Sequence, residues 1–274
     1  MSIEIHEVST SRALAPDLTP YRLTIKRGEE RITPLREELT KHLSGQKDAK
    51  RSVATLYPAN APLFAMIVEF FFDTGLAAFA ARTLGERIAL MTGFSTLRKH
   101  STDLSLFNPW HQDANFFHPD RGLTFWIPLE DSGVERPALT FVEGVDGLSV
   151  DESMSHFETV RSKILTDGVL NFTDEQLRDR LGNFKEISPV VHAGECLCFT
   201  PLVFHRTQSG PKLTKSRLSI EFRAIPAMSF PEVASKQSYT LRGVQNGEDG
   251  LFFYNRKRES RFVTLTAFRP PVEN

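Results

Sequence analysis

Short apolar runs rich in aromatic and β-branched residues dominate the chain after about Phe94, and they constrain its fold more than any other feature. Each run is too short for an ordinary helix and is bounded by glycine, proline or polar residues, which is typical of β-strands. We therefore expect a mainly β core over residues 94–226. The strand candidates are residues 123–129, 138–142, 195–199 and 218–223.

The preceding part, residues 1–93, is predicted to be mainly helical. Thr33-Pro34 has the form of an N-cap followed by proline at the first helical position, and a glycine can end a helix. The helix candidates are a segment from Thr33 with Leu35, Leu39 and Leu43 at helical spacing, a segment capped by Asn60 and running to residue 72, and residues 76–84 ending at Gly85.

Residues 151–183 interrupt the strand pattern. Thr173 and Gln176 form a capping box, Leu177 and Leu181 follow at helical spacing, and Gly182 can end the helix. We interpret this stretch as a helical insertion in the β core. An insertion of this length can act as a lid or serve only as packed scaffold.

The last stretch, residues 227–274, mixes polar loops with apolar runs at 251–254 and 262–265, which are late strands or edge segments. Neither a repeat nor a low-complexity linker divides the chain. At 274 residues it is long enough for one large domain with a well-buried core. We therefore expect a single domain over residues 1–274.

Composition offers no electrostatic reason to propose nucleic acid or an anionic membrane as a partner, because the formal net charge is −1. The most apolar segment, residues 61–72, is too short to span a bilayer and contains Glu69. The first residues show no secretory signal. Cys196 and Cys198 are best explained as buried free thiols, which favours a reducing, cytoplasmic location.

Three residues form the candidate metal site. On a strand, side chains alternate between faces, so His111 and Asp113 would point the same way. His205, which follows an apolar run, would supply the third ligand once the intervening strands fold back. Two imidazoles and one carboxylate make the facial triad of non-haem Fe(II) oxygenases, which leaves coordination positions open.

A histidine and an aspartate two residues apart occur by chance in many proteins, so context matters. The other histidines lack a carboxylate at this spacing with a matching distal partner, and we expect them to be structural or exposed. They include His100, His118, His156 and His192.

The context resembles the phytanoyl-CoA dioxygenase family of Fe(II)/2-oxoglutarate oxygenases over roughly residues 94–226. The resemblance is carried by three segments: Asn108-Pro109-Trp110-His111-Gln112-Asp113, the Trp126-containing run from Gly122 to Asp131, and the apolar run from Gly194 to His205. It implies a double-stranded β-helix (jelly-roll) core and an enzyme that uses Fe(II), 2-oxoglutarate and O2.

The resemblance also implies a co-substrate anchor at Arg217 and Ser219. Arginine can grip a carboxylate with two parallel charge-assisted hydrogen bonds, and serine on the same strand face adds a hydroxyl donor. The competing interpretation is a surface strand, because Glu221 and Arg223 continue the polar alternation. The chain departs from the family pattern at residues 135–146 and at Arg206-Thr207, so substrate specificity does not follow from the family.

These residues predict oxidation of a small organic molecule, with 2-oxoglutarate converted to succinate and CO2. Related halogenases typically replace the carboxylate ligand by glycine or alanine, so Asp113 favours hydroxylation, desaturation or ring-forming oxidation. Phe116, Thr124 and Trp126 are candidates for the substrate pocket. The alternatives are a cupin-like isomerase or hydrolase without 2-oxoglutarate, and a non-catalytic binding barrel. The primary substrate and the oligomeric state stay open.

Overall fold

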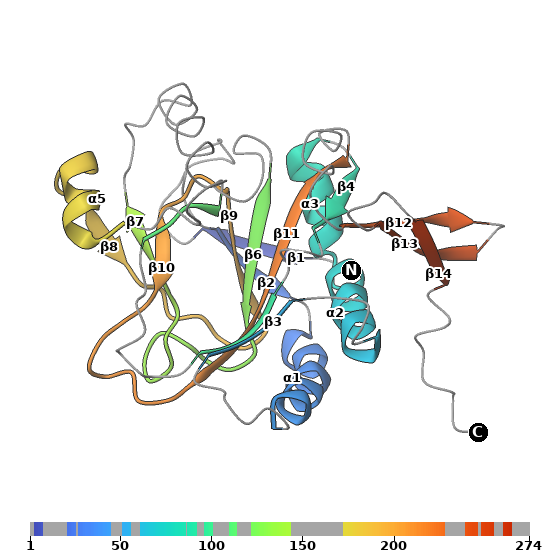
Figure 1. Cartoon of the computed structure of the whole chain (residues 1–274), viewed down its shortest axis with the longest axis horizontal. Coiled ribbons are helices and arrows are strands. Elements are labelled where there is room, and N and C mark those ends of the chain that lie inside the picture. The colour runs from blue at the N-terminus through green and yellow to red at the C-terminus, as the bar shows by residue number, and fades with distance from the viewer. Residues whose placement is uncertain are drawn as a thin grey trace.

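The computed structural model describes residues 3–7, 21–25, 27–44, 51–55, 61–85, 87–91, 96–100, 110–113, 122–143, 172–227, 239–245, 248–254 and 260–264. In these residues the chain forms a large sheet, a small sheet and helices packed against the large sheet (Figure 1).

The large sheet has 11 strands, and its neighbouring strands run antiparallel. Its order is β1-β2-β9-β6-β11-β4-β12-β13-β14, with β5 paired to β11 and β3 paired to β5. Strand β11 is the long central member, because it pairs with β6 along one edge and with β5 and then β4 along the other. The bounds are β1 Ile3–Glu7, β2 Tyr21–Ile25, β3 Arg51–Thr55, β4 Ile88–Leu90, β5 Thr96–His100, β6 Leu123–Pro128, β9 Glu195–Phe199, β11 Arg217–Pro226, β12 Tyr239–Gln245, β13 Glu248–Tyr254 and β14 Ser260–Thr264.

The small sheet has the order β10-β7-β8, made of β10 (His205–Thr207), β7 (Leu139–Glu143) and β8 (Lys185–Ile187). Trp126, Leu197 and Phe199 of the large sheet pack against Leu139 and Phe141 of β7. We call the side of the large sheet that meets the small sheet its inner face. The predicted double-stranded β-helix core is confirmed, and all four predicted core strands correspond to β6, β7, β9 and β11.

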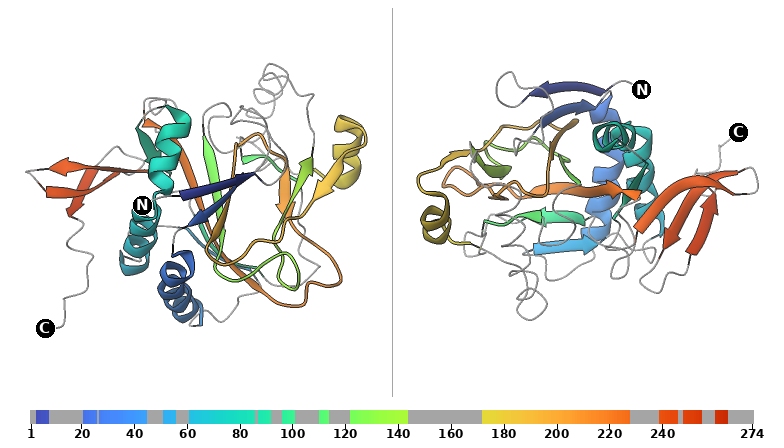
Figure 2. Two further views of the ribbon diagram at one scale, coloured as in Figure 1. Left: turned by 180° about the vertical axis from the view of Figure 1, so that it is seen from behind. Right: turned by 90° about the horizontal axis from the view of Figure 1, so that it is seen from above.

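Three helices cover the opposite side of the large sheet, which we call its outer face: α1 (Gly28–Ser44), α2 (Ala61–Asp73) and α3 (Leu76–Leu84). Figures 1 and 2 show them together at one end of the molecule. Phe71 of α2 contacts the rings of Phe125 and Phe222, at centroid distances of 5.5 and 4.8 Å. The predicted boundaries of α2 and α3 are confirmed to within one residue, and Gly85 ends α3 in the left-handed conformation (φ 74°).

Helix α1 begins earlier than predicted, so the proposed start at Thr33 is wrong. It begins at Gly28, and Pro34 lies inside the helix. The reason is packing: Ile32, Leu35 and Leu39 are all buried at helical spacing, so the apolar face starts before the Thr-Pro pair. Thr33 instead donates its hydroxyl to the carbonyl of Glu29, 2.9 Å away.

The first 93 residues also supply strands that the sequence did not reveal. β1 to β4 all join the large sheet, and β2 pairs with β9 in a register that sets Tyr21 against Cys198. These strands are short, and β2 and β4 pair with β9 and β11, which lie far away in sequence. The local sequence pattern therefore gives little indication of these strands.

The predicted helical insertion is described only from Phe172 onward; residues 151–171 lie outside the described residues. Its helix is confirmed as α5 (Asp174–Leu181), with a capping box formed by Thr173 and Gln176 and an end at Gly182. Among the described helices, none is both long and apolar enough to cross a membrane.

The two late apolar runs lie in β13 and β14, except Leu265, which is outside the described residues. β12, β13 and β14 form a meander joined to the rest of the large sheet by one pair, Thr240 and Leu90 of β4. Figure 1 shows this meander projecting from the end of the molecule opposite α5.

Candidate metal centre

A short antiparallel bridge brings two of the predicted ligands together. The backbone N–H of His111 donates to the carbonyl of His205 and the N–H of His205 to the carbonyl of His111, both at 3.0 Å. Directly opposed residues in such a bridge project their side chains to the same face. The two imidazole centroids are accordingly 4.3 Å apart.

The expectation that His111 and Asp113 share a regular strand is wrong. Bridge pairing stops at His111, and Asp113 lies in a 3₁₀ turn. Gln112 between them donates its side-chain amide to the carbonyl of Leu202 at 2.5 Å, which ties this segment to the loop before His205. The local turn, and not strand alternation, therefore aims Asp113.

One ligand atom from each of His111, Asp113 and His205 lies within 4.8 Å of the others. Among the described residues this is the only cluster of histidine, cysteine and carboxylate side chains that could hold a metal ion. Two imidazoles and a carboxylate fit iron well, since this donor set binds one face of Fe(II) and leaves the other open. The structure thus brings the three together, and their role as ligands stays a prediction.

The surroundings of His205 favour the neutral imidazole that a metal ligand needs. Its Nδ1 lies 3.0 Å from the carbonyl oxygen of Val203, which suits an Nδ1–H donor and leaves the Nε2 lone pair for a metal. Burial lowers the pKa of this imidazole, although Asp113 partly offsets the effect. The ring of Phe199 packs edge-on against the imidazole at 4.8 Å.

Asp113 is fully buried and held by two side chains. Arg223 grips both of its oxygens, with Nε 3.1 Å from Oδ2 and Nη2 3.0 Å from Oδ1, and the Thr124 hydroxyl donates to Oδ2 at 2.5 Å. Burial by itself would raise the pKa of Asp113, yet Arg223 and the nearby imidazoles hold it well below its usual value. The carboxylate is therefore ionised.

Arg223 belongs to a longer chain of buried charges. Its Nη2 also donates to Glu221 Oε2 at 3.1 Å, and Arg98 of β5 lies 3.2 Å from the same oxygen. The pKa of Glu221 is lowered, because Arg98 and Arg223 outweigh the opposing effect of burial. Charges of alternating sign thus run from Arg98 on β5 through Glu221 and Arg223 on β11 and end at Asp113 in the turn.

Arg217, the predicted co-substrate anchor, is completely buried on the inner face. Its Nη1 donates to the carbonyl oxygens of Pro137 and Ala138, each at 3.0 Å, and its guanidinium lies 5.1 Å from the centre of the Trp126 ring. Ser219 is also buried, and its hydroxyl has no hydrogen-bond partner among the described residues. The competing interpretation of a solvent-exposed strand is wrong.

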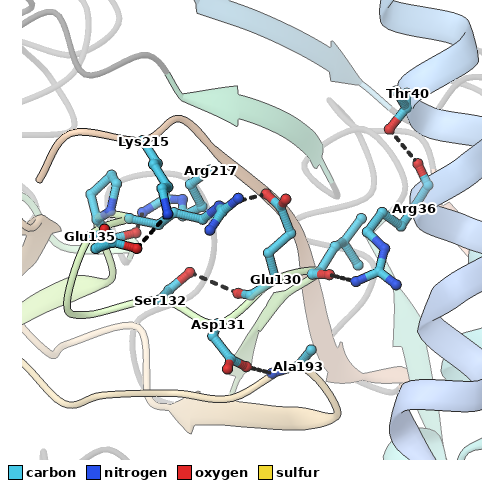
Figure 3. Close-up of polar contacts among 12 residues, drawn as sticks. Arg36, Thr40, Glu130, Asp131, Ser132, Glu135, Ala193, Lys215 and Arg217 are labelled. Carbon is cyan, nitrogen blue, oxygen red and sulfur yellow. Dashed lines mark hydrogen bonds and ion pairs between the residues drawn. The ribbon is translucent and has the colours of Figure 1, made fainter.

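The loop after β6 closes over the Arg217 end of β11 (Figure 3). Lys215 Nζ lies 2.5 Å from Glu135 Oε2, the Ser132 hydroxyl donates to the carbonyl of Glu130 at 3.0 Å, and the Ala193 N–H donates to Asp131 at 2.9 Å. These contacts hold in place the loop whose Pro137 and Ala138 carbonyl oxygens accept hydrogen bonds from Arg217.

The three substrate-pocket candidates have different positions. Thr124 contacts Asp113 directly, and fully buried Trp126 lies beside Arg217. Phe116 lies outside the described residues, as does His118. A part in substrate binding stays a prediction for all three.

The residue that follows the distal histidine joins both ligand segments to α5. The Arg206 guanidinium stacks 4.3 Å from the Trp110 ring centre and lies 2.7 Å from Asp174 Oδ1, which also accepts the indole N–H of Trp110 at 2.7 Å. Asp174 opens α5 directly after its cap. The described part of the insertion therefore braces the metal centre.

Sequence reasoning placed Glu221 and Arg223 in the surface-strand alternative and so missed their contacts in the candidate site. Every second residue of β11 from Arg217 to Arg223 is polar, so the sequence predicts a polar face. It does not predict whether that face contacts solvent or the small sheet. His100 is 5% exposed and pairs with Arg217 across β5 and β11. His192, by contrast, is exposed, with Nδ1 3.5 Å from Asp131, and His156 lies outside the described residues.

Several solved structures share this fold. They include the "non-heme alpha ketoglutarate dependent epimerase SnoN from nogalamycin biosynthesis" (15% identity, 82% of this chain and 81% of that chain, TM-score 0.54). HygX from Streptomyces hygroscopicus, with nickel and 2-oxoglutarate bound, aligns at 16% identity over 77% and 83% of the chains, with a TM-score of 0.54. The carbocyclase SnoK aligns at 17% identity over 82% and 84%, with a TM-score of 0.52. At these identities the likeness establishes the fold.

A search of curated proteins found no match. The family model for phytanoyl-CoA dioxygenase, however, matches residues 34–217, which is more than half of the chain. The match includes all three triad residues and Arg217, and it begins well before the region of resemblance seen in the sequence. The chain belongs to the phytanoyl-CoA dioxygenase family of 2-oxoglutarate-dependent, non-haem iron dioxygenases.

Proposed function

We propose that this enzyme hydroxylates a small organic molecule with O2 while 2-oxoglutarate is converted to succinate and CO2. The observation that carries the proposal is the convergence of His111, Asp113 and His205 within 4.8 Å. A buried arginine and a hydroxyl on the inner face of β11 complete the set of groups that such a reaction needs.

In this proposal the three convergent side chains hold iron, and Arg217 and Ser219 hold the distal carboxylate of 2-oxoglutarate. When bound, iron and 2-oxoglutarate together supply the activation of O2. Two donors suit a ligand carboxylate: the Ser219 hydroxyl and the Trp126 indole N–H are buried without a partner among the described residues. Such atoms are costly to bury unless a ligand satisfies them.

The protein's own contribution is positioning and exclusion of water. Phe199 and Trp126 of the inner face, together with Phe141 of the small sheet, form the apolar surroundings of His205 and Arg217. Charge-assisted hydrogen bonds are stronger in such a setting than in water. Asp113 would hold the metal from a carboxylate that Arg223 and Thr124 keep ionised and oriented.

Asp113 also bears on the type of oxidation. A retained carboxylate ligand favours hydroxylation over halide transfer, as the family chemistry implies. The solved structures of similar fold include an epimerase and a carbocyclase, so stereochemical inversion or ring formation are alternative outcomes. We propose a small-molecule substrate of secondary metabolism, a single domain that acts in the cytoplasm, and no nucleic-acid or membrane partner.

The test is anaerobic addition of Fe(II) and then 2-oxoglutarate, followed by the weak visible charge-transfer band of the chelate. We expect the band in the wild-type protein and in His192→Ala, whose histidine is exposed and is not part of the triad cluster, but not in His205→Ala. A folded, iron-loaded protein without the band would contradict the proposal and favour a metal enzyme that does not use 2-oxoglutarate. Failure to bind any metal would favour a binding barrel.

The oxidation itself is tested by succinate formation with a panel of candidate molecules, followed by mass analysis of the product. A gain of one oxygen atom supports hydroxylation. Loss of two hydrogens, or an isomer of unchanged mass, would replace it by desaturation, ring formation or epimerisation.

A further inference from the structure

The carboxylate of Asp113 rests against a pair of side chains that the sheet places opposite each other. Thr124 of β6 and Arg223 of β11 are Cα partners in the register of these strands. Directly opposed residues point to the same face with their Cβ atoms about 5 Å apart. Between them they make three hydrogen bonds to Asp113, and both oxygens of the carboxylate are engaged.

We propose that Arg223 is a positioning residue for the metal centre: with Thr124 it forms a cradle that fixes the rotation of the Asp113 carboxylate relative to His111 and His205. The inference rests on the proposed function, because it takes Asp113 as an iron ligand. It adds a residue that neither the triad nor the co-substrate anchor includes.

A fixed carboxylate matters here because Asp113 lies in a turn, where no strand pairing holds it. Its side chain is free to rotate unless something outside the turn restrains it. The planar fork of an arginine is well suited, since it meets two carboxylate oxygens at once and defines the plane of the group. Each carboxylate oxygen has two lone pairs, and Oδ1 accepts only from Arg223, so it keeps a lone pair that can bind a metal, whereas Oδ2 accepts from both Arg223 and Thr124.

The cradle is itself anchored. Glu221 lies two residues before Arg223 on the same face and accepts from its Nη2, while Arg98 contacts the same carboxylate oxygen of Glu221. The side chains of Arg223, Glu221 and Asp113 are 4%, 7% and 0% exposed. A buried arginine held by two carboxylates has little freedom to swing away, so the orientation it imposes persists.

Glu221 also balances charge. Fe(II) would add two positive charges next to the guanidinium of Arg223, and buried like charges repel strongly. The carboxylate of Glu221 offsets that repulsion. Arg223 can therefore orient the ligand without expelling the metal.

The experiment measures anaerobic Fe(II) affinity without 2-oxoglutarate, by competition with a chromophoric chelator. Partners that orient metal ligands are typically worth about 10–100-fold in metal affinity. We expect a loss of that size for Arg223→Gln, a smaller loss for Arg223→Lys, which keeps the charge but not the fork, and a smaller loss for Thr124→Val. The visible spectrum of the Co(II)-loaded proteins should shift in the same order, since it reports ligand geometry.

A matched control is Arg22→Gln, which removes an arginine that contacts Glu195 at 3.4 Å on the β2–β9 edge of the sheet. It should leave Fe(II) affinity and the Co(II) spectrum unchanged. If Arg223→Gln does not fold, Thr124→Val retains every charge, and Arg223→Gln combined with Glu221→Gln removes the uncompensated carboxylate.

A double-mutant cycle separates positioning from general stability. In an Asp113→Asn background, Co(II) bound by the two histidines should be insensitive to Arg223→Gln. An equal loss in both backgrounds, or unchanged affinity and Co(II) spectra in Arg223→Gln and Thr124→Val, would overturn the inference. The chelate band of the wild-type protein tests the proposed function separately, so either idea can fail while the other stands.

Discussion

The two faces of β11 are equally buried but have opposite chemistry. On the outer face, Ile220, Phe222 and Ala224 pack against the helices. On the inner face, Arg217, Ser219, Glu221 and Arg223 are between 0% and 5% exposed. Burial alone therefore does not distinguish a structural position from a candidate site position; what each side chain contacts does.

The two faces contribute differently to the free energy of folding. Apolar area removed from water stabilises the fold by about 25 cal/mol per Å², so the outer face favours folding directly. A buried ion pair gains little overall, because desolvation offsets the attraction between its charges. The inner-face side chains of β11 therefore bring little net stability, which is consistent with the binding role proposed for them. Four predictions test this division.

The largest effect is expected for Phe222→Ala on the outer face. Loss of the contacts with Phe70 and Phe71 should lower the free energy of unfolding by about 3–5 kcal/mol, measured by urea denaturation. Fe(II) affinity of the folded protein should change by less than about twofold, because the side chain of Phe222 packs on the outer face, opposite to its neighbours Glu221 and Arg223. Val134→Ala, at an exposed position, is the control. A parallel loss of iron binding would break the division between the faces.

Arg217→Gln on the inner face should act mainly on the co-substrate. Hydrogen bonds to charged groups are worth about 1.5–3 kcal/mol, so 2-oxoglutarate affinity should fall by about 10–100-fold, measured by titration of the chelate band. Fe(II) binding should be nearly unchanged. The control is Lys212→Gln, which removes an exposed cation from the segment that precedes β11. Equal losses in the two variants would argue against an anchor at Arg217.

Ser219→Ala should stabilise the folded apoprotein but weaken its binding of 2-oxoglutarate. Its hydroxyl is buried without a partner among the described residues, so removal should raise the apoprotein's stability, by up to about 1 kcal/mol. The same change should weaken 2-oxoglutarate binding about fivefold. Thermal unfolding of the apoprotein and the chelate titration measure the two quantities. If both fall, or neither changes, the hydroxyl is not a ligand donor.

The smallest effect concerns the thiols of Cys196 and Cys198, which pack in the outer-face core. Burial raises the pKa of each thiol well above its ordinary value. A thiolate-trapping reagent should therefore not react with the native protein but should titrate both thiols in urea. Rapid labelling of the native protein would show that the outer face opens, which contradicts its assignment as the stable side.

The sequence predicted which strands carry the candidate site. It did not predict how the side chains of the site contact one another. The alternation of polar and apolar residues in β11 predicted two faces. It did not predict whether the polar face would contact water or a second sheet. The small sheet and the loop after β6 decide that question, and neither is local to β11. The contact between Arg223 and Asp113 joins residues 110 positions apart, so no local sequence pattern could predict it.

Two other errors have the same origin. Thr33-Pro34 resembles a helix start, yet the burial of Ile32 one residue earlier extends α1 to Gly28. β2 was missed because its alternation is short and its partner is β9. In each case, packing against a distant segment outweighed local preference.

The sequence by itself determined the fold class, the family and the identity of the metal-ligand candidates, because these depend on residue types and on periodicity. Tertiary structure alone decided that the polar face of β11 is the interior, that a turn aims Asp113, and that Thr124 and Arg223 hold it. The physical reason is that a buried charge is stable only beside its partners, and those partners are supplied by strands that meet only once the sheets have formed.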